Sequence, residues 1–187
     1  MGTWQAGANR LVDALADLTP TPGGGSAGAV AAAMGAGLGV MVCGLTLKSK
    51  KTEEARKPAL REALTKLSEL KAKLQNCIAE DSRAYDLFVA ARKLAKDDAT
   101  RPAKMQEAII YAAQVPLETA KYAAQAVKTL EAARPNLMAA VESDYKSAGY
   151  LLKAGIACAA ENVKINTPMI EDKGLAQKLE TEVAALA

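Results

Sequence analysis

An acidic segment near the middle of the chain holds the residues best suited to proton transfer. It reads EDSRAYD at positions 80–86 and interrupts a run of apolar residues with helical spacing. In a helix, Asp81 and Tyr85 lie four residues apart on one face. A carboxylate beside a phenol can accept and return a proton. A solvated helix face is the alternative interpretation.

A glycine-rich turn, PTPGGGS at positions 20–26, is the second candidate. Glycine lets a ligand lie against bare backbone, and the start of the helix expected to follow offers free amide groups to an anion. No Gly-Lys-Ser/Thr follows, so the turn is not a P-loop. A tight turn between packed helices explains the glycines equally well. Its candidate binding residues are Pro22, Gly23, Gly24, Gly25 and Ser26.

The third group combines Asp144 with the amides Asn162 and Asn166, which share a helix face. Asp144 precedes Asn162 by 18 residues, which is about 27 Å along a helix. One small molecule cannot contact all three within one copy of that helix. Either the ligand is elongated, the groups serve its different ends, or a second subunit contributes. Helix capping is the alternative role for the asparagines.

Several kinds of chemistry are excluded by residue type. The chain has no histidine, which removes Ser-His and Cys-His catalysis and histidine-zinc sites. Its cysteines, Cys43, Cys77 and Cys158, match no disulfide framework or zinc spacing, so we expect small buried apolar groups. Catalysis must therefore use carboxylates, lysines, amides, hydroxyls or helix ends.

The amino-acid composition limits the kinds of partner that the protein can bind. The net charge is only +3, with basic and acidic residues interleaved, and 4% of residues are aromatic; both argue against nucleic-acid binding. Residues 27–47 carry no charge and are long enough to span a bilayer. Their many glycines and alanines instead favour a fully buried central helix. No signal peptide is visible, so we expect a cytoplasmic protein with no membrane partner.

The elements that must position these residues are all helical. No alternating strand pattern occurs, and apolar residues recur at helical spacing throughout. We expect one domain over residues 1–187, an antiparallel bundle of long helices. Ser26 is the expected N-cap of the helix over 27–47, and Pro116 is expected to kink its helix. The expected helices cover residues 4–18, 27–47, 58–95, 102–133, about 137–165 and 172–186.

A helix over 58–95 would be about 57 Å long, longer than the diameter of so small a domain. Such a helix must bend, break or leave apolar surface for a partner chain. A homodimer is therefore expected.

In order along the chain, these segments resemble the cyclodeaminase/cyclohydrolase family of folate enzymes. Each segment alone is a weak signal, whereas six in the right order are specific. The matching segments are PTPGGGSAGA at 20–29, KSKK at 48–51, EDSRAYDLF at 80–88, VPLETA at 115–120, SDYKSAGYLL at 143–152 and ENVKIN at 161–166.

The resemblance implies an all-α homodimer with a folate substrate, no metal and no tightly bound cofactor. Asp81 would be the acid/base and Asp144 a second candidate catalytic residue. The glycine turn, Tyr85, Asn162 and Asn166 would lie at or support the substrate site. By their charge, Lys48, Lys50 and Lys51 would attract the glutamate tail of the folate.

The expected reaction is hydrolysis of 5,10-methenyltetrahydrofolate to 10-formyltetrahydrofolate. Deaminative cyclisation of 5-formiminotetrahydrofolate and a non-catalytic folate-binding role are the alternatives. Two departures from the family pattern bear on this choice. Gly44 and Met138 stand where the family commonly has asparagines, so two side-chain amides that would touch substrate are missing.

Overall fold

A computed structural model describes residues 2–186, and the regular structure in that range is entirely helical. This confirms the expected all-α class. The helices are α1 (Thr3–Ala16), α2 (Gly24–Lys48), α3 (Lys57–Lys93), α4 (Arg101–Ala133), α5 (Glu142–Asn166) and α6 (Lys173–Ala184). Short 3-10 turns occupy Glu54–Arg56, Arg134–Asn136, Ala139–Val141 and Thr167–Met169.

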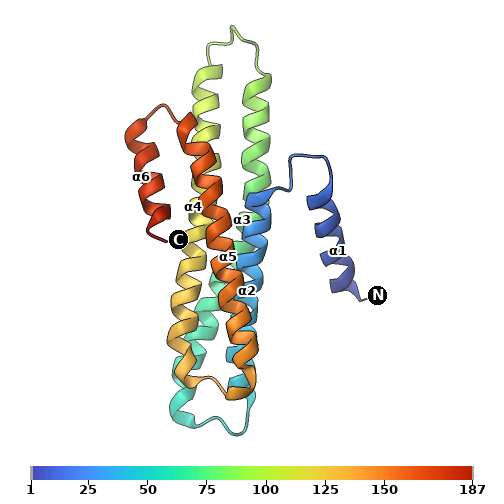
Figure 1. Cartoon of the computed structure of the whole chain (residues 1–187), viewed down its shortest axis with the longest axis vertical. Coiled ribbons are helices and arrows are strands. Elements are labelled where there is room, and N and C mark those ends of the chain that lie inside the picture. The colour runs from blue at the N-terminus through green and yellow to red at the C-terminus, as the bar shows by residue number, and fades with distance from the viewer. Residues whose placement is uncertain (1, 187) are drawn as a thin grey trace.

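Helices α2 to α5 form an elongated antiparallel bundle (Figure 1). Short connections join successive long helices, which is why neighbours run in opposite directions. Helix α6 packs on the outside of the bundle beside α4 and α5, whereas α1 stands away from it. The two longest helices, α3 with 37 residues and α4 with 33, are each continuous. The long helix predicted over 58–95 is therefore present, and it fits because the bundle is elongated rather than compact.

The core is made of leucines on α3 that face alanines on the other helices. Leu60, Leu67, Leu70 and Leu74 are completely buried and recur at helical spacing. Alanine supplies most of the remaining core, since its small side chain lets helix axes approach closely. Buried core alanines on the other helices include Ala32, Ala36, Ala113, Ala120, Ala123, Ala126 and Ala148.

Helices α2 and α5 approach most closely where glycines face each other. A Cβ added to Gly155 would lie 2.7 Å from the Cβ of Ala32 and 2.8 Å from the carbonyl oxygen of Gly28. A Cβ on Gly35 would lie 2.8 Å from the carbonyl oxygen of Ala148. These glycines therefore set the spacing between the helices and explain the small-residue composition of α2.

Two identical substitutions on α5 are expected to have opposite effects on stability. Gly155→Ala forces α2 and α5 apart and should lower the free energy of unfolding by about 1–3 kcal/mol. Gly149→Ala meets nothing within 4 Å and should raise it by up to about 1 kcal/mol through helix propensity. Urea denaturation measures both changes. Equal effects at the two positions would show that close packing does not fix this contact.

Two local predictions were wrong and one was confirmed. Gly23, not Ser26, is the N-cap of α2, because the glycines themselves enter the helix and place Ser26 inside its first turn. Helix α4 runs from Arg101 to Ala133 and contains Pro116, in agreement with the expected range of 102–133. Cys158 is exposed, whereas Cys43 and Cys77 are buried. Burial raises the pKa of the Cys43 thiol to about 11, so this thiol stays protonated and unreactive.

Helix α2 is buried on one side only, which corrects the prediction of a fully buried central helix. Met34, Met41 and Leu45 on its other side are exposed. By length and composition α2 could cross a membrane, with a mean hydropathy of 2.0 over 18 residues, of which 44% are buried in the bundle. A core helix of a globular bundle meets the same criteria.

Candidate active site

One pocket brings together the glycine turn, Asp81, Tyr85 and both asparagines. It has a volume of about 300 Å³ and lies where the beginning of α2 meets the second half of α3, the first half of α4 and the end of α5. Asp81 and Tyr85 line it from the same face of α3, as their spacing predicts. The lining residues are Pro20, Thr21, Gly23, Gly24, Gly25, Asp81, Ala84, Tyr85, Phe88, Ile109, Ala112, Asn162, Ile165, Asn166 and Met169.

The carboxylate of Asp81 is held against the first turn of α2. Ser26 Oγ is fully buried and donates a hydrogen bond of 2.7 Å to Asp81 Oδ2. The other oxygen, Oδ1, lies only 2.0 Å from where a Cβ on Gly25 would be. Position 25 must therefore be glycine for the carboxylate to lie there. The positive end of α2 also favours a negative charge at this place.

Asn166 is oriented by a proline on a neighbouring helix. Pro116 has no amide hydrogen, so the carbonyl of Ala112, four residues earlier, lacks its usual helical partner. Asn166 Nδ2 donates to that carbonyl at 3.0 Å and to the carbonyl of Asn162 at 2.8 Å. Both amide hydrogens of Asn166 are thus used within the protein. Its Oδ1 is left to accept a hydrogen bond from a molecule in the pocket.

Asn162 completes the polar side of the pocket. Its Nδ2 donates to the carbonyl of Cys158 at 2.8 Å, one turn earlier on α5. The same nitrogen lies 3.5 Å from the position of a Cβ on Gly24. The glycine turn and the asparagines therefore form one polar wall. Phe88, Ile109, Ile165 and Met169 supply apolar surface, so the pocket suits a flat, partly polar ring.

Six predicted residues do not line this pocket. Lys48, Lys50 and Lys51 are at the other end of α2, about 36 Å from Gly24 along the helix. Asp144 is in the first turn of α5, about 27 Å from Asn162. Pro22 and Ser26 are next to the pocket but do not line it; Ser26 contacts Asp81 instead. Within one chain, then, the predicted site is divided between two ends of the bundle.

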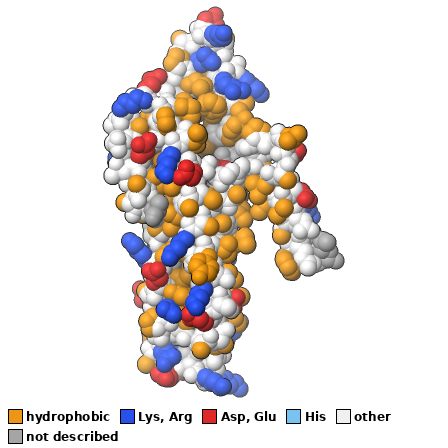
Figure 2. All heavy atoms as spheres, in the orientation of Figure 1, with side chains coloured by type: hydrophobic (Ala, Val, Ile, Leu, Met, Phe, Trp, Pro, Cys, Tyr) orange, Lys and Arg blue, Asp and Glu red, His pale blue; other side chains and the backbone are white. Residues whose placement is uncertain are grey.

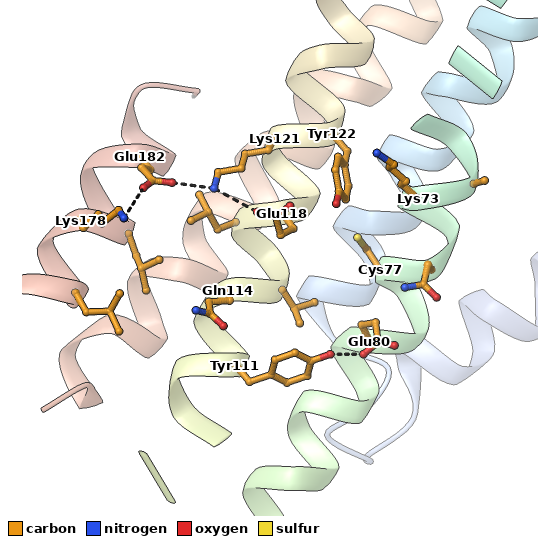
Figure 3. A pocket seen from close by; sticks show the side chains of 16 residues that line it. Lys73, Cys77, Glu80, Tyr111, Gln114, Glu118, Lys121, Tyr122, Lys178 and Glu182 are labelled. Carbon is orange, nitrogen blue, oxygen red and sulfur yellow. Dashed lines mark hydrogen bonds and ion pairs between the residues drawn. The ribbon is translucent and has the colours of Figure 1, made fainter. Parts of the chain in front are cut away.

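A larger cavity of about 790 Å³ lies on a different face of α3, between α3, α4 and α6 (Figure 3). Its charges are already paired. Lys121 contacts Glu118 at 3.2 Å and Glu182 at 2.8 Å, and Tyr111 donates a hydrogen bond to Glu80. That bond is the main cause of a lowered pKa at Glu80. These contacts hold α6 and α3 to α4. We therefore infer that the side chains of this cavity stabilise helix packing.

The acid–phenol contact found here differs from the predicted one. Sequence spacing pairs Asp81 with Tyr85, whereas the structure joins Glu80 to Tyr111 and Asp81 to Ser26. Adjacent residues on a helix point about 100° apart, so Glu80 and Asp81 face different helices. Sequence analysis also missed the apolar walls of the pocket. Phe88 and Met169 follow Asp81 and Asn162 by seven residues, a helical spacing that could have identified them.

The sequence profile described as formiminotransferase-cyclodeaminase matches residues 7–185. A methenyltetrahydrofolate cyclohydrolase from Methylorubrum extorquens is 36% identical over 180 residues, covering 94% of this chain and 86% of that protein. A formimidoyltransferase-cyclodeaminase from Sus scrofa is 31% identical over 169 residues, covering 88% of this chain but only 31% of that protein.

The fold has a solved counterpart. A crystal structure of formiminotetrahydrofolate cyclodeaminase from Thermotoga maritima superposes with a TM-score of 0.84 and 27% sequence identity. The match covers 94% of this chain and 85% of that chain.

Proposed function

Because the chain belongs to the formiminotransferase-cyclodeaminase family, we propose that this folate one-carbon enzyme hydrolyses 5,10-methenyltetrahydrofolate to 10-formyltetrahydrofolate. The observation that carries the proposal is the carboxylate of Asp81, held by Ser26 at the wall of a pocket suited to a flat ring. The 36% identical relative of matching length is named for this reaction.

The proposed chemistry needs only one group that moves protons. The methenyl carbon is already cationic, so water adds to it directly. Asp81 accepts one proton from that water as the C–O bond forms. Asp81 then returns the proton to N5 while the C–N5 bond breaks, and the second water proton is released to solvent. The product keeps its formyl group on N10, so atoms and charge balance.

The remaining polar groups are assigned to binding and orientation. Asn166 Oδ1 accepts a hydrogen bond from an N–H group of the folate ring, and the backbone at Gly23 to Gly25 lies against the ring. Tyr85 and Asn162 border the reacting carbon. Within one chain, Gly44 and Met138 lie outside this pocket.

Absorbance of the methenyl substrate tests the proposal. Purified protein should accelerate loss of its near-ultraviolet absorbance in proportion to enzyme concentration. A rate equal to that of buffer would contradict hydrolysis. Tight binding of substrate without turnover would favour a non-catalytic folate-binding protein of the same fold.

Cyclodeamination of 5-formiminotetrahydrofolate is a second candidate. The Thermotoga structure and the porcine relative are named for it, and it involves the same folate carbon. Ammonia released from the formimino substrate, faster than methenyl hydrolysis at equal enzyme concentration, would select this reaction.

Pro116→Ala is expected to weaken substrate binding without destabilising the protein. Alanine supplies the amide hydrogen that proline lacks, so the carbonyl of Ala112 no longer needs Asn166. The freed Asn166 should raise KM about fivefold, the worth of roughly one hydrogen bond, while Tm stays equal or rises. Steady-state kinetics and thermal denaturation measure these. A fall in Tm with unchanged KM would assign Pro116 to packing instead.

We also propose a cytoplasmic homodimer that binds neither nucleic acid nor membranes and holds no tightly bound cofactor. The exposed apolar side of α2 supports the dimer. A second copy would also account for the distance between the pocket and the other candidates. Asp144 and the lysines at 48, 50 and 51 could reach a folate only from a neighbouring chain.

A further inference from the structure

Helix α1 has an apolar stripe that its own chain leaves uncovered. None of its residues is buried, and Figure 1 shows it standing apart from the bundle. Trp4 is 75% exposed, Val12 64% and Leu15 37%. Together with Leu11 they line one face of α1, whereas Arg10 lies on the other. An amphipathic helix of this kind needs a partner for its apolar face.

Helix α2 has a second uncovered stripe. Val30, Met34, Met41 and Leu45 follow one another at helical spacing on its outer side. Met34 is 56% exposed and Leu45 44%, and the helix has no charged residue before Lys48. Figure 2 shows hydrophobic side chains along the face of the bundle beside α1.

From these two stripes we infer that two copies of the chain exchange their α1 helices, each α1 packing on the outer stripe of the other copy's α2. The inference extends the homodimer proposed above. The α1 stripe fits along the α2 stripe, because Trp4 to Leu15 spans about 16 Å and Val30 to Leu45 about 22 Å of helix. They also match in character, since neither contains a charge. Each stripe would otherwise stay exposed to water.

The exchange would link dimer assembly to the structure of both pockets. Helix α1 leads directly into the turn that contains Pro20, Thr21 and Gly23, which line the pocket. With α1 docked on the partner, this turn is fixed at both ends, by α2 of its own chain and by the other copy. Two-fold symmetry repeats the contact, so the interface contains four helices. Loss of the α1 contact should therefore affect the site as well as assembly.

Charge substitutions on the full-length chain test the inference. Val12→Glu/Leu15→Glu on α1, and separately Met34→Glu on α2, should each raise the dimer dissociation constant at least 100-fold. Arg10→Glu changes the charge more than any single one of these substitutions but lies on the polar face of α1, so it should leave the dimer unchanged. Light scattering after size exclusion measures the mass, and circular dichroism checks that each variant keeps its helices.

A cross-link identifies the partner directly. Benzoylphenylalanine in place of Val12, in a mixture of ¹⁵N-labelled and unlabelled chains, should form mixed cross-links to residues 30–45. Cross-links confined to one chain would overturn the exchange, because they would show α1 folding back on its own bundle. So would wild-type protein that binds phosphatidylglycerol vesicles through these stripes.

The proposed dimer and the exchange fail in different ways. A monomeric wild type overturns both. A dimer insensitive to all three substitutions overturns only the exchange and leaves the dimer and the hydrolytic function in place. If a monomeric wild type hydrolyses the methenyl substrate, the proposed function holds although the dimer and the exchange are both wrong.

Discussion

Asp81→Asn is expected to lower kcat for methenyltetrahydrofolate hydrolysis by about 10²–10⁴, the usual contribution of a general acid–base residue. Asparagine has nearly the same shape, and its oxygen still accepts the hydrogen bond from Ser26. The pocket should therefore keep its geometry, and KM should change by less than about threefold. Stopped-flow absorbance of the substrate measures both constants.

Glu80→Gln is the matched control. It removes a carboxylate from the adjacent position, where the side chain accepts a hydrogen bond from Tyr111 and lines the other cavity. We expect kcat within about threefold of wild type, because this group does not reach the pocket of Asp81. Equal losses in the two variants would point to general damage in α3. A fully active Asp81→Asn enzyme would exclude acid–base catalysis by Asp81.

The helices were predictable because their signals are local. Leucines at helical spacing on α3 and prolines at the starts of α3 and α4 define elements that tertiary contacts then preserve. The start of α2 was misplaced because Gly24 and Gly25 read as a turn, although neither adopts a positive φ. Their real constraint is space. Space between helices cannot be read from a sequence before the facing helix is known.

The sequence was enough to predict which residues form the candidate site, but not how they contact one another. Asp81, Tyr85, Asn162 and Asn166 come together because each lies on a helix face that spacing defines. The bond from Asn166 to the carbonyl of Ala112 joins residues 54 positions apart and depends on an amide hydrogen that Pro116 lacks. The lysines at 48, 50 and 51 were grouped with the site by charge alone. Charge carries no position, whereas the helix expected over residues 27–47 already separated these lysines from the glycine turn by about 32 Å.

Gly25→Ala is expected to remove most of the activity through a single methyl group. The new Cβ would stand 2.0 Å from Asp81 Oδ1 and 2.7 Å from Asp81 Cγ, so the carboxylate must move out of its position beside Ser26. A displacement of this size should lower kcat by at least about 10². The backbone has no reason to resist the change, because Gly25 has no positive φ and alanine favours helix.

Gly24→Ala supplies the control for that substitution. Its Cβ would meet Asn162 Nδ2 at 3.5 Å, an ordinary contact that leaves the Asp81 carboxylate in place, so kcat should stay within about threefold of wild type. KM should rise, because the methyl group covers backbone that is assigned to the folate ring. Gly25→Ala should therefore be nearly inactive and Gly24→Ala active, although both variants add one methyl group to the same helical turn. Similar kinetics in the two variants would mean that the position of Asp81 does not limit the reaction.

A double-mutant cycle identifies the clash as the cause. In a chain that carries Asp81→Ala, the carboxylate that would collide with the new methyl group is gone. Gly25→Ala should then cost no stability, and the helix preference for alanine should add up to about 1 kcal/mol. In the wild-type background the same change should destabilise the protein by about 1–3 kcal/mol. The difference between the two free energies is the coupling between residues 25 and 81. A coupling near zero would show that Gly25 is required for some other reason, and that the carboxylate is not held by the shape of this turn.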